Sequence, residues 1–286
     1  MNSEKVWFVT GATRGIGAEI AKAALAAGHR LVATGRDRTA LDAVFGADHP
    51  RVLTLALDVA READAQQAVA ATLARFGRID VLVNNAGYGL LGGFESLDTE
   101  AIERQFATNV PGLFHVTRAA LPAMRHQRAG QIFNLSSVGG MVGYAGASVY
   151  VSTKFAVEGF SESLAMEVAA FGIGVTIVEP GFFRTDFLDN RSVQYGGRSV
   201  DTAYDASAAQ WRDAYEAYNH RQLGDPAKLG IALVALANEA KPPLRFAAGS
   251  DAYAAIGQKL ASVRAEMDRW HKLSVSTDHV QESVAA

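Results

Sequence analysis

A short glycine-rich turn is the first place where residue types and spacing could do chemistry. It reads Thr10-Gly11-Ala12-Thr13-Arg14-Gly15-Ile16-Gly17 and lies between an apolar run and an amphipathic segment. Glycine lets the backbone turn sharply and approach a ligand closely. At the start of a helix, exposed N–H groups and the positive end of the helix dipole bind phosphate. The turn therefore predicts a pyrophosphate site, although glycine-rich turns also occur without ligands. Its spacing is GxxxGxG, not the GxGxxG of many dinucleotide binders.

The end of the next apolar run bears on the kind of dinucleotide. An NAD site places Asp or Glu there to bind the ribose 2′-hydroxyl. Here Gly35 stands at that point, Arg36 follows, and Arg14 lies in the glycine turn. Two guanidinium groups near one ribose favour a 2′-phosphate, because arginine binds phosphate through paired hydrogen bonds. The alternatives are that both arginines are solvated surface residues and that Asp37 is the ribose acid. For Asp37 we favour a helix cap.

A tyrosine and a lysine four residues apart form a second chemical pair. Tyr150 and Lys154 share one face of a predicted helix. A free tyrosine has a pKa of about 10, too high for acid–base work near neutrality. A lysine ammonium beside it stabilises the phenolate, so we expect Lys154 to lower that pKa. Such pairs are common on ordinary helices, and the pair alone does not establish a function.

Short apolar runs alternate with longer amphipathic segments along the chain. The predicted strands are Val6–Thr10, Arg30–Thr34, Val52–Leu57, Val81–Asn84, Gln131–Leu135, Val175–Glu179 and Arg245–Ala247. The predicted helices are Ile16–Ala27, Arg38–Phe45, Glu62–Phe76, Thr99–Arg128, Ser148–Phe171 and Pro226–Asn238. This alternation predicts an α/β fold: a doubly wound, Rossmann-like parallel sheet with helices on both faces. We expect seven strands in the order 3-2-1-4-5-6-7 within a single domain spanning residues 1–286.

Two segments depart from the alternation. Phe182–Gly224 is too long for a plain connection and is expected to form a lid or to contain its own helices. Residues 250–273 have apolar side chains at helical spacing, which predicts an amphipathic C-terminal helix. These side chains are Ile256, Leu260, Val263, Met267 and Trp270. Residues 274–286 are expected to be frayed or disordered.

Several motifs, taken together and in order, resemble those of the short-chain dehydrogenase/reductase family over roughly residues 5–185. They are Thr10–Gly17, Asp58-Val59, Asn84-Asn85-Ala86-Gly87, Asn109, Ser136-Ser137, Tyr150 with Lys154, and the segment Pro180-Gly181-Phe182-Phe183-Arg184-Thr185. The resemblance implies hydride transfer between a nicotinamide and a carbonyl or alcohol carbon.

The resemblance also implies a role for each matching residue. Tyr150 gives a proton to the carbonyl oxygen, and Lys154 hydrogen-bonds the nicotinamide ribose. Ser137 orients the substrate oxygen; Ser136 competes for that role, and only the 13-residue distance to Tyr150 favours Ser137. Asn109 holds a water that links Lys154 to solvent, or else is structural. The residues expected to bind the cofactor, NADP(H), are Gly11, Thr13, Arg14, Gly15, Ile16, Gly17, Arg36, Asp58, Val59, Asn85, Ala86, Gly87, Tyr150, Lys154, Pro180, Gly181, Phe183 and Thr185.

Composition excludes several other classes of protein. The net charge is -3, so no global basic field attracts nucleic acid. The chain has no cysteine and its seven histidines form no ligand-spaced cluster, so we expect no protein-held metal. No run of 18 apolar residues and no signal-peptide pattern occur, which favours a cytoplasmic protein without a membrane span.

Aromatic residues of the segment Phe182–Gly224 suit a bulky apolar ketone or aldehyde, or they belong to the core. They are Phe182, Phe183, Phe187, Tyr195, Tyr204, Trp211, Tyr215 and Tyr218, and Tyr88, Leu90, Leu91 and Phe94 are candidates for a further wall. A 3-oxoacyl-carrier-protein reductase is the nearest rival, with Arg125, His126 and Arg128 as a thin basic patch. An NADP(H)-sensing regulator without turnover is the rival from another class. Surplus apolar residues on Ser148–Phe171, namely Phe155, Phe160, Leu164 and Val168, favour a homodimer or homotetramer, as in the family.

Overall fold

A seven-stranded parallel sheet forms the centre of the computed structural model, which describes residues 4–189, 192–196 and 205–279. Its order is β3-β2-β1-β4-β6-β7-β9. The strands are β1 Val6–Val9, β2 Arg30–Gly35, β3 Val52–Ala56, β4 Val81–Asn84, β6 Gly130–Leu135, β7 Ile173–Pro180 and β9 Arg245–Ala248. These are the seven predicted strands in the predicted order, so the doubly wound fold is confirmed. The labels β5 and β8 belong to a small second sheet.

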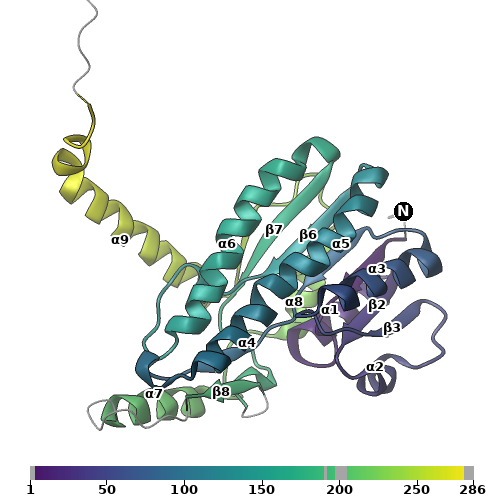
Figure 1. Cartoon of the computed structure of the whole chain (residues 1–286), viewed down its shortest axis with the longest axis horizontal. Coiled ribbons are helices and arrows are strands. Elements are labelled where there is room, and N and C mark those ends of the chain that lie inside the picture. The colour runs from purple at the N-terminus through teal and green to yellow at the C-terminus, as the bar shows by residue number, and fades with distance from the viewer. Residues whose placement is uncertain (1–3, 190–191, 197–204, 280–286) are drawn as a thin grey trace, which may run out of the picture.

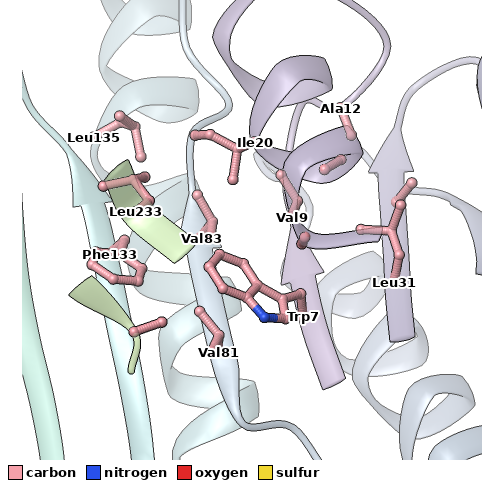
Figure 2. Packing of buried hydrophobic residues seen from close by; sticks show 14 of the residues in the cluster. Trp7, Val9, Ala12, Ile20, Leu31, Val81, Val83, Phe133, Leu135 and Leu233 are labelled. Atoms are coloured by element: carbon pink, nitrogen blue, oxygen red, sulfur yellow. The ribbon is translucent and has the colours of Figure 1, made fainter. Parts of the chain in front are cut away.

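Helices cover both faces of the sheet (Figure 1). One face packs on α1 (Gly15–Ala26), α2 (Arg38–Phe45) and α8 (Pro226–Leu236), and the other on α3 (Glu62–Phe76), α5 (Pro111–Gln127) and α6 (Ser148–Val168). Neighbouring residues of a strand point to opposite faces, so Trp7 joins the first core and Phe8 the second. Figure 2 shows Trp7 beside Val83 and Phe133, beneath Ile20 of α1. Burial on both faces explains the continuously apolar strands.

The predicted helix Thr99–Arg128 is wrong, because two helices occupy this range. α4 runs from Thr99 to Asn109 and α5 from Pro111 to Gln127. Pro111 has no N–H to continue the hydrogen-bond ladder of α4, and it stands at the first position of α5, where no such bond is needed. Arg128 has a left-handed backbone (φ 53°) and ends α5.

Other element ends differ by a few residues. α6 ends at Val168, and a 3₁₀ turn over Ala169–Phe171 completes the predicted helix Ser148–Phe171. α8 ends at Leu236 instead of Asn238. Such shifts at helix ends are ordinary and leave the topology unchanged.

The long segment Phe182–Gly224 after β7 was expected to form a lid or to contain its own helices, and it does contain elements of its own. It has a 3₁₀ turn (Asp186–Leu188), the strand β8 (Val193–Tyr195) and the helix α7 (Asp205–Tyr218). β8 pairs in parallel with β5 (Gly89–Leu91), which follows β4. This two-stranded sheet attaches the segment to the main body. Tyr204 lies outside the described residues.

The C-terminal helix α9 (Ser250–Val275) projects from the body (Figure 1). Only Ala252 and Ile256 of this helix are buried. Leu260, Met267 and Trp270 are 55%, 61% and 53% exposed. The predicted helix is therefore present, but most of its apolar face packs on nothing in the described chain. It extends two residues into the segment expected to be frayed, and residues 280–286 lie outside the described residues.

Candidate active site

A cavity of about 580 Å³ lies at the carboxyl ends of the parallel strands. Ligands of open α/β sheets bind in the crevice outside these strand ends. Gly11 follows β1, Gly35 ends β2, Asn85 follows β4, Ser136 follows β6 and Pro180 ends β7, and all of them line the cavity. The topology thus brings motifs distant in sequence into one site.

The glycine turn leaves no room for side chains where it meets the cavity. Gly11 and Gly15 have φ of +66° and +59°, a left-handed backbone that favours glycine. A Cβ on Gly17 would overlap the Asn85 side chain and lie 3.0 Å from the Gly11 carbonyl carbon. Asn85 holds the turn in place, since its Nδ2 donates to the carbonyl oxygens of Thr10 (2.9 Å) and Gly11 (3.1 Å). The start of α1 therefore presents backbone N–H groups beside the cavity, as a pyrophosphate requires.

The residues at the end of β2 distinguish the two candidate ribose-binding groups, the arginine pair and Asp37. Arg14, Gly35 and Arg36 line the cavity. A Cβ on Gly35 would lie 3.0 Å from Thr13 Cγ2, so an acidic side chain fits poorly there. The Asp37 side chain caps α2 by accepting a hydrogen bond from Ala40 N (3.2 Å). Asp37 is absent from the cavity wall, and its predicted capping role is confirmed.

Asp58 and Val59 line the cavity from the loop after β3. Asp58 Oδ1 accepts a hydrogen bond from Ala60 N (3.1 Å), which fixes this loop as an Asx turn. From the loop after β4, Asn85, Ala86 and Gly87 also line the cavity. The remaining predicted cofactor residues on its wall are Gly11, Thr13, Gly15, Ile16, Gly17, Pro180, Gly181, Phe183 and Thr185.

Tyr150, Lys154 and Ser137 meet on the same cavity wall. Tyr150 and Lys154 are one turn apart on α6, with Lys154 Nζ 5.7 Å from the centre of the tyrosine ring. Lys154 Nζ donates to the Leu135 carbonyl oxygen at 2.7 Å, which ties α6 to the end of β6. Ser137 Oγ accepts a hydrogen bond from Gly139 N (3.0 Å), and its hydroxyl interacts with Tyr150. Ser136 also reaches the cavity wall but is 4% exposed.

Burial governs the ionisation of the tyrosine–lysine pair. Desolvation raises the pKa of Tyr150 to about 12, and the Ser137 hydrogen bond opposes this rise. Desolvation also lowers the pKa of Lys154 to about 8, while the Glu158 carboxylate opposes this fall. The expectation of a lowered tyrosine pKa is therefore wrong for this structure, because loss of solvent outweighs the Ser137 hydrogen bond. At pH 7, Lys154 still has its proton in most molecules.

Asn109 lies behind the cavity wall instead of on it. Its Oδ1 accepts a hydrogen bond from Tyr88 N (3.2 Å), and its Nδ2 donates to Tyr88 O (3.1 Å) and Thr153 Oγ1 (3.0 Å). The side chain is 3% exposed at the last residue of α4. Asn109 thus connects α4 to the loop after β4 and to α6, which agrees with the structural alternative.

Aromatic side chains close the far end of the cavity. Phe182, Phe187 and Tyr215 come from the predicted segment. Sequence reasoning missed Tyr144 and Arg104, which also line the cavity; neither is part of a motif. Trp211 and Tyr218 support the wall from behind. A Cβ on Gly146 would lie 2.9 Å from Trp211, and the Tyr218 ring packs edge-on against Phe182 at 5.2 Å.

One group in the described residues has metal-ligand geometry: Asp186, Asp189 and His220. Asp189 Oδ1 lies 3.1 Å from His220 Nε2 and accepts a hydrogen bond from Asn219 Nδ2 at 2.7 Å. These protein contacts account for the group, and the absence of a metal stays a prediction. Among the described helices, none combines the length and hydrophobicity needed to cross a lipid bilayer.

Known proteins share this architecture. The family model described as short chain dehydrogenase matches residues 5–196. "Oxidoreductase BOA17" of Botryotinia fuckeliana is 38% identical, covering 96% of this chain and 99% of its own. The "3-ketodihydrosphingosine reductase" of Bacteroides thetaiotaomicron is 36% identical over 86% of this chain and 88% of its own.

Solved structures extend the likeness to three dimensions. A short-chain dehydrogenase from Streptomyces avermitilis is 42% identical, with a TM-score of 0.89 over 97% of this chain and all of that one. The structure titled "ElxO with NADP Bound" is 28% identical, with a TM-score of 0.68 over 83% of this chain and 92% of that one.

The chain belongs to the short-chain dehydrogenase family. It is an oxidoreductase that acts on CH–OH or carbonyl groups with a nicotinamide cofactor. The cavity fits such a cofactor, because the glycine turn brings the first residues of α1, Gly15 to Gly17, to its wall, where their backbone can meet a pyrophosphate.

Proposed function

We propose that the chain reduces a bulky apolar ketone or aldehyde with NADPH. One observation carries this proposal: a single cavity joins the glycine turn, two arginines, the Ser137–Tyr150–Lys154 group and an aromatic wall. The nicotinamide supplies a hydride to the carbonyl carbon when the cofactor is bound. Tyr150 gives its proton to the carbonyl oxygen as negative charge develops there. Ser137 donates a hydrogen bond to the same oxygen and orients it.

Lys154 acts on the tyrosine and on the cofactor. Its ammonium stabilises the phenolate that remains after proton transfer, which is worth most in a buried site. With the cofactor bound, it would also hydrogen-bond the nicotinamide ribose, as the family resemblance implies. Asn109 acts as a positioning residue, because its amide holds α6 and the loop after β4 in register.

The preference for NADP(H) rests on Arg14 and Arg36. Both line the cavity at the ribose end, where Gly35 leaves no acid to bind a 2′-hydroxyl. The test is fluorescence titration with NADPH and NADH side by side, using the wild type and Arg36→Ala. We expect the wild type to bind NADPH at least about tenfold more tightly, or about 1.4 kcal/mol. Arg36→Ala removes most of that difference. Equal binding of both cofactors by the wild type contradicts the assignment.

The aromatic wall supports a bulky apolar substrate. The relative named 3-ketodihydrosphingosine reductase is, by its name, a reductase of a ketone. The carrier-protein reductase is disfavoured, because Arg125 and Arg128 precede β6 and so lie at the amino ends of the strands, opposite the cavity. There Arg128 donates to Ala170 O at 3.0 Å, just before β7 begins. An NADPH oxidation screen that compares long-chain ketones with carrier-linked 3-oxoacyl groups separates the two.

No observation favours a regulator without turnover. Tyr150, Lys154 and Ser137 all line one cavity, as catalysis requires. Tyr150→Phe tests this point. We expect it to abolish NADPH oxidation by ketones while leaving the Kd for NADPH within about twofold, because the ring is kept and only the proton donor is lost. Turnover near the wild-type rate in this variant refutes the mechanism.

We infer that the chain forms a homodimer or homotetramer through α5 and α6 and works in the cytoplasm. On α6, Phe155 and Met166 are 46% and 73% exposed, although Leu164 and Val168 belong to the core. The Phe160 ring packs on Phe114 of α5 at 4.4 Å. Light scattering should give a multiple of 30.3 kDa, and a mass near one chain contradicts the interface.

A further inference from the structure

Two buried carboxyl groups lie behind Lys154, on the side away from the cavity. Glu158 follows Lys154 by one turn of α6 and is 5% exposed, and Glu179 of β7 is 1% exposed. Neither residue lines the cavity. Glu158 Oε2 and Glu179 Oε1 each lie 3.4 Å from Nε of Arg245 on β9. Three elements of the fold therefore converge on one buried polar cluster that the proposed hydride transfer does not use.

The cluster has more acidic groups than partners to neutralise them. Arg245 also pairs with the more exposed Glu162, through Nη2 at 2.7 Å. Both oxygens of Glu158 and Oε1 of Glu179 lack a well-formed hydrogen bond in the described part of the chain. The other groups facing the pair are the Ser136 hydroxyl at the end of β6 and the Lys154 ammonium. Two carboxyl groups in contact can hydrogen-bond to each other only when one holds a proton.

Ionisation of the cluster follows from this crowding. Burial raises the pKa of Glu158, and burial together with repulsion from Glu158 raises the pKa of Glu179 to about 7. In the other direction, the Glu158 carboxylate raises the pKa of Lys154 against the effect of burial. Both shifts favour a state in which the two carboxyl groups together hold one proton and one negative charge.

We propose that Glu158 and Glu179 share one proton and that Glu158 is the positioning residue that keeps Lys154 protonated in its buried site. This inference rests on the proposed function, because it assigns a purpose to the charge of Lys154. Without a negative charge at Glu158, the ammonium loses the carboxylate that raises its pKa and keeps its hydrogen bond to the Leu135 carbonyl oxygen. The lysine then loses its proton at a lower pH and no longer stabilises the Tyr150 phenolate.

The direct test is the titration of Lys154, which needs no substrate. NMR of protein with isotope-labelled lysine side chains follows its ammonium, and Lys154→Arg identifies the signal by removing it. In Glu158→Gln we expect the pKa of Lys154 to fall by about one unit or more. Glu162→Gln is the matched control, because Glu162 is an exposed acid on the same helix that pairs with the same arginine. Its Lys154 signal should titrate as in the wild type.

Glu179→Gln tests the shared proton separately. We expect it to abolish the weaker inflection near the Glu179 pKa of about 7 in the Lys154 titration while leaving the main step in place. In kinetics, Glu158→Gln should move the alkaline limb of the kcat/KM profile to lower pH by the same amount, and Glu158→Asp should restore part of it.

Three results overturn the inference. They are an unshifted Lys154 in Glu158→Gln, a shift of equal size in Glu162→Gln, and persistence of the inflection in Glu179→Gln. Should Glu158→Gln fail to fold, Glu158→Asp decides in its place: it draws the carboxylate back by one methylene, so the pKa of Lys154 should fall by a smaller amount, and an unchanged value overturns the inference. If Glu158→Gln shifts the pKa of Lys154 but the wild type turns over no ketone, this inference is supported and the proposed function is rejected. The two failures are therefore distinguishable.

Discussion

Replacing Gly17 with alanine tests whether the glycine turn is as tightly built as its contacts indicate. The new Cβ overlaps the Asn85 side chain, which makes hydrogen bonds of 2.9 and 3.1 Å to Thr10 and Gly11. Overpacking of this kind costs about 1–3 kcal/mol. Losing one of the two hydrogen bonds adds about 1 kcal/mol. We therefore expect Gly17→Ala to lower the free energy of unfolding by about 2–4 kcal/mol.

Gly257→Ala is the matched control for this change. Gly257 is an exposed position of α9, away from the proposed interface, where a Cβ meets nothing within 4 Å. Alanine there should stabilise the protein by about 0.5–1 kcal/mol, because glycine loses more conformational freedom in a helix. Urea unfolding followed by circular dichroism measures both variants, and NADPH titration shows whether the displaced turn also loses affinity. If Gly17→Ala proves as stable as Gly257→Ala, the turn has room for a methyl group, and the steric argument for its glycines is refuted.

Three further predictions concern other parts of the molecule. Asp37→Ala should cost about 1 kcal/mol of stability through the lost cap of α2 while leaving the Kd for NADPH unchanged; weaker binding by titration returns Asp37 to the cofactor site. In the wild type, the pKa of Glu179 is about 7 in the folded state against 4.5 when unfolded. Folding stability should therefore fall as pH rises from about 4.5 to about 7, and Glu179→Gln should show less of this fall in urea unfolding across that window. Tyr215→Ala should raise KM for bulky ketones roughly tenfold through lost burial of the substrate against this cavity-lining ring without changing the NADPH Kd, and an unchanged KM contradicts the role of α7 as a wall.

Periodicity and turn residues were sufficient to predict the seven strands and the helices between them, because each strand is a short apolar run followed by a helix; the order of the strands came with the family resemblance. They did not show which proline breaks a helix. Pro111 separates α4 from α5, yet α5 continues through Pro122. Pro122 lies on the exposed side of its helix, where water can satisfy the carbonyl that loses its partner. This difference depends on burial, which is a property of the packed fold.

The site also has residues that local patterns predicted and contacts that only the packed fold reveals. Local motifs predicted the residues around the glycine turn and on the cavity side of α6, since each lies at a strand end or one helical turn from another. The pairing of β5 with β8 joins two three-residue strands about a hundred residues apart, and no local pattern indicates it. The contact of Glu158 with Glu179 and Arg245 likewise needs three elements in register. The raised pKa of Tyr150 follows from burial of the whole wall and not from its neighbour at i+4.

The projecting part of α9 carries a tryptophan, so intrinsic fluorescence can report on this helix. The chain has three tryptophans, and they lie in three different surroundings: Trp7 is fully buried, Trp211 packs behind the cavity, and Trp270 is 53% exposed on the projecting helix. A dissolved quencher such as iodide should reach Trp270 readily and Trp7 hardly at all. Loss of quenching at Trp270 would then report any surface that covers α9, while the buried emission serves as an internal reference for an intact core.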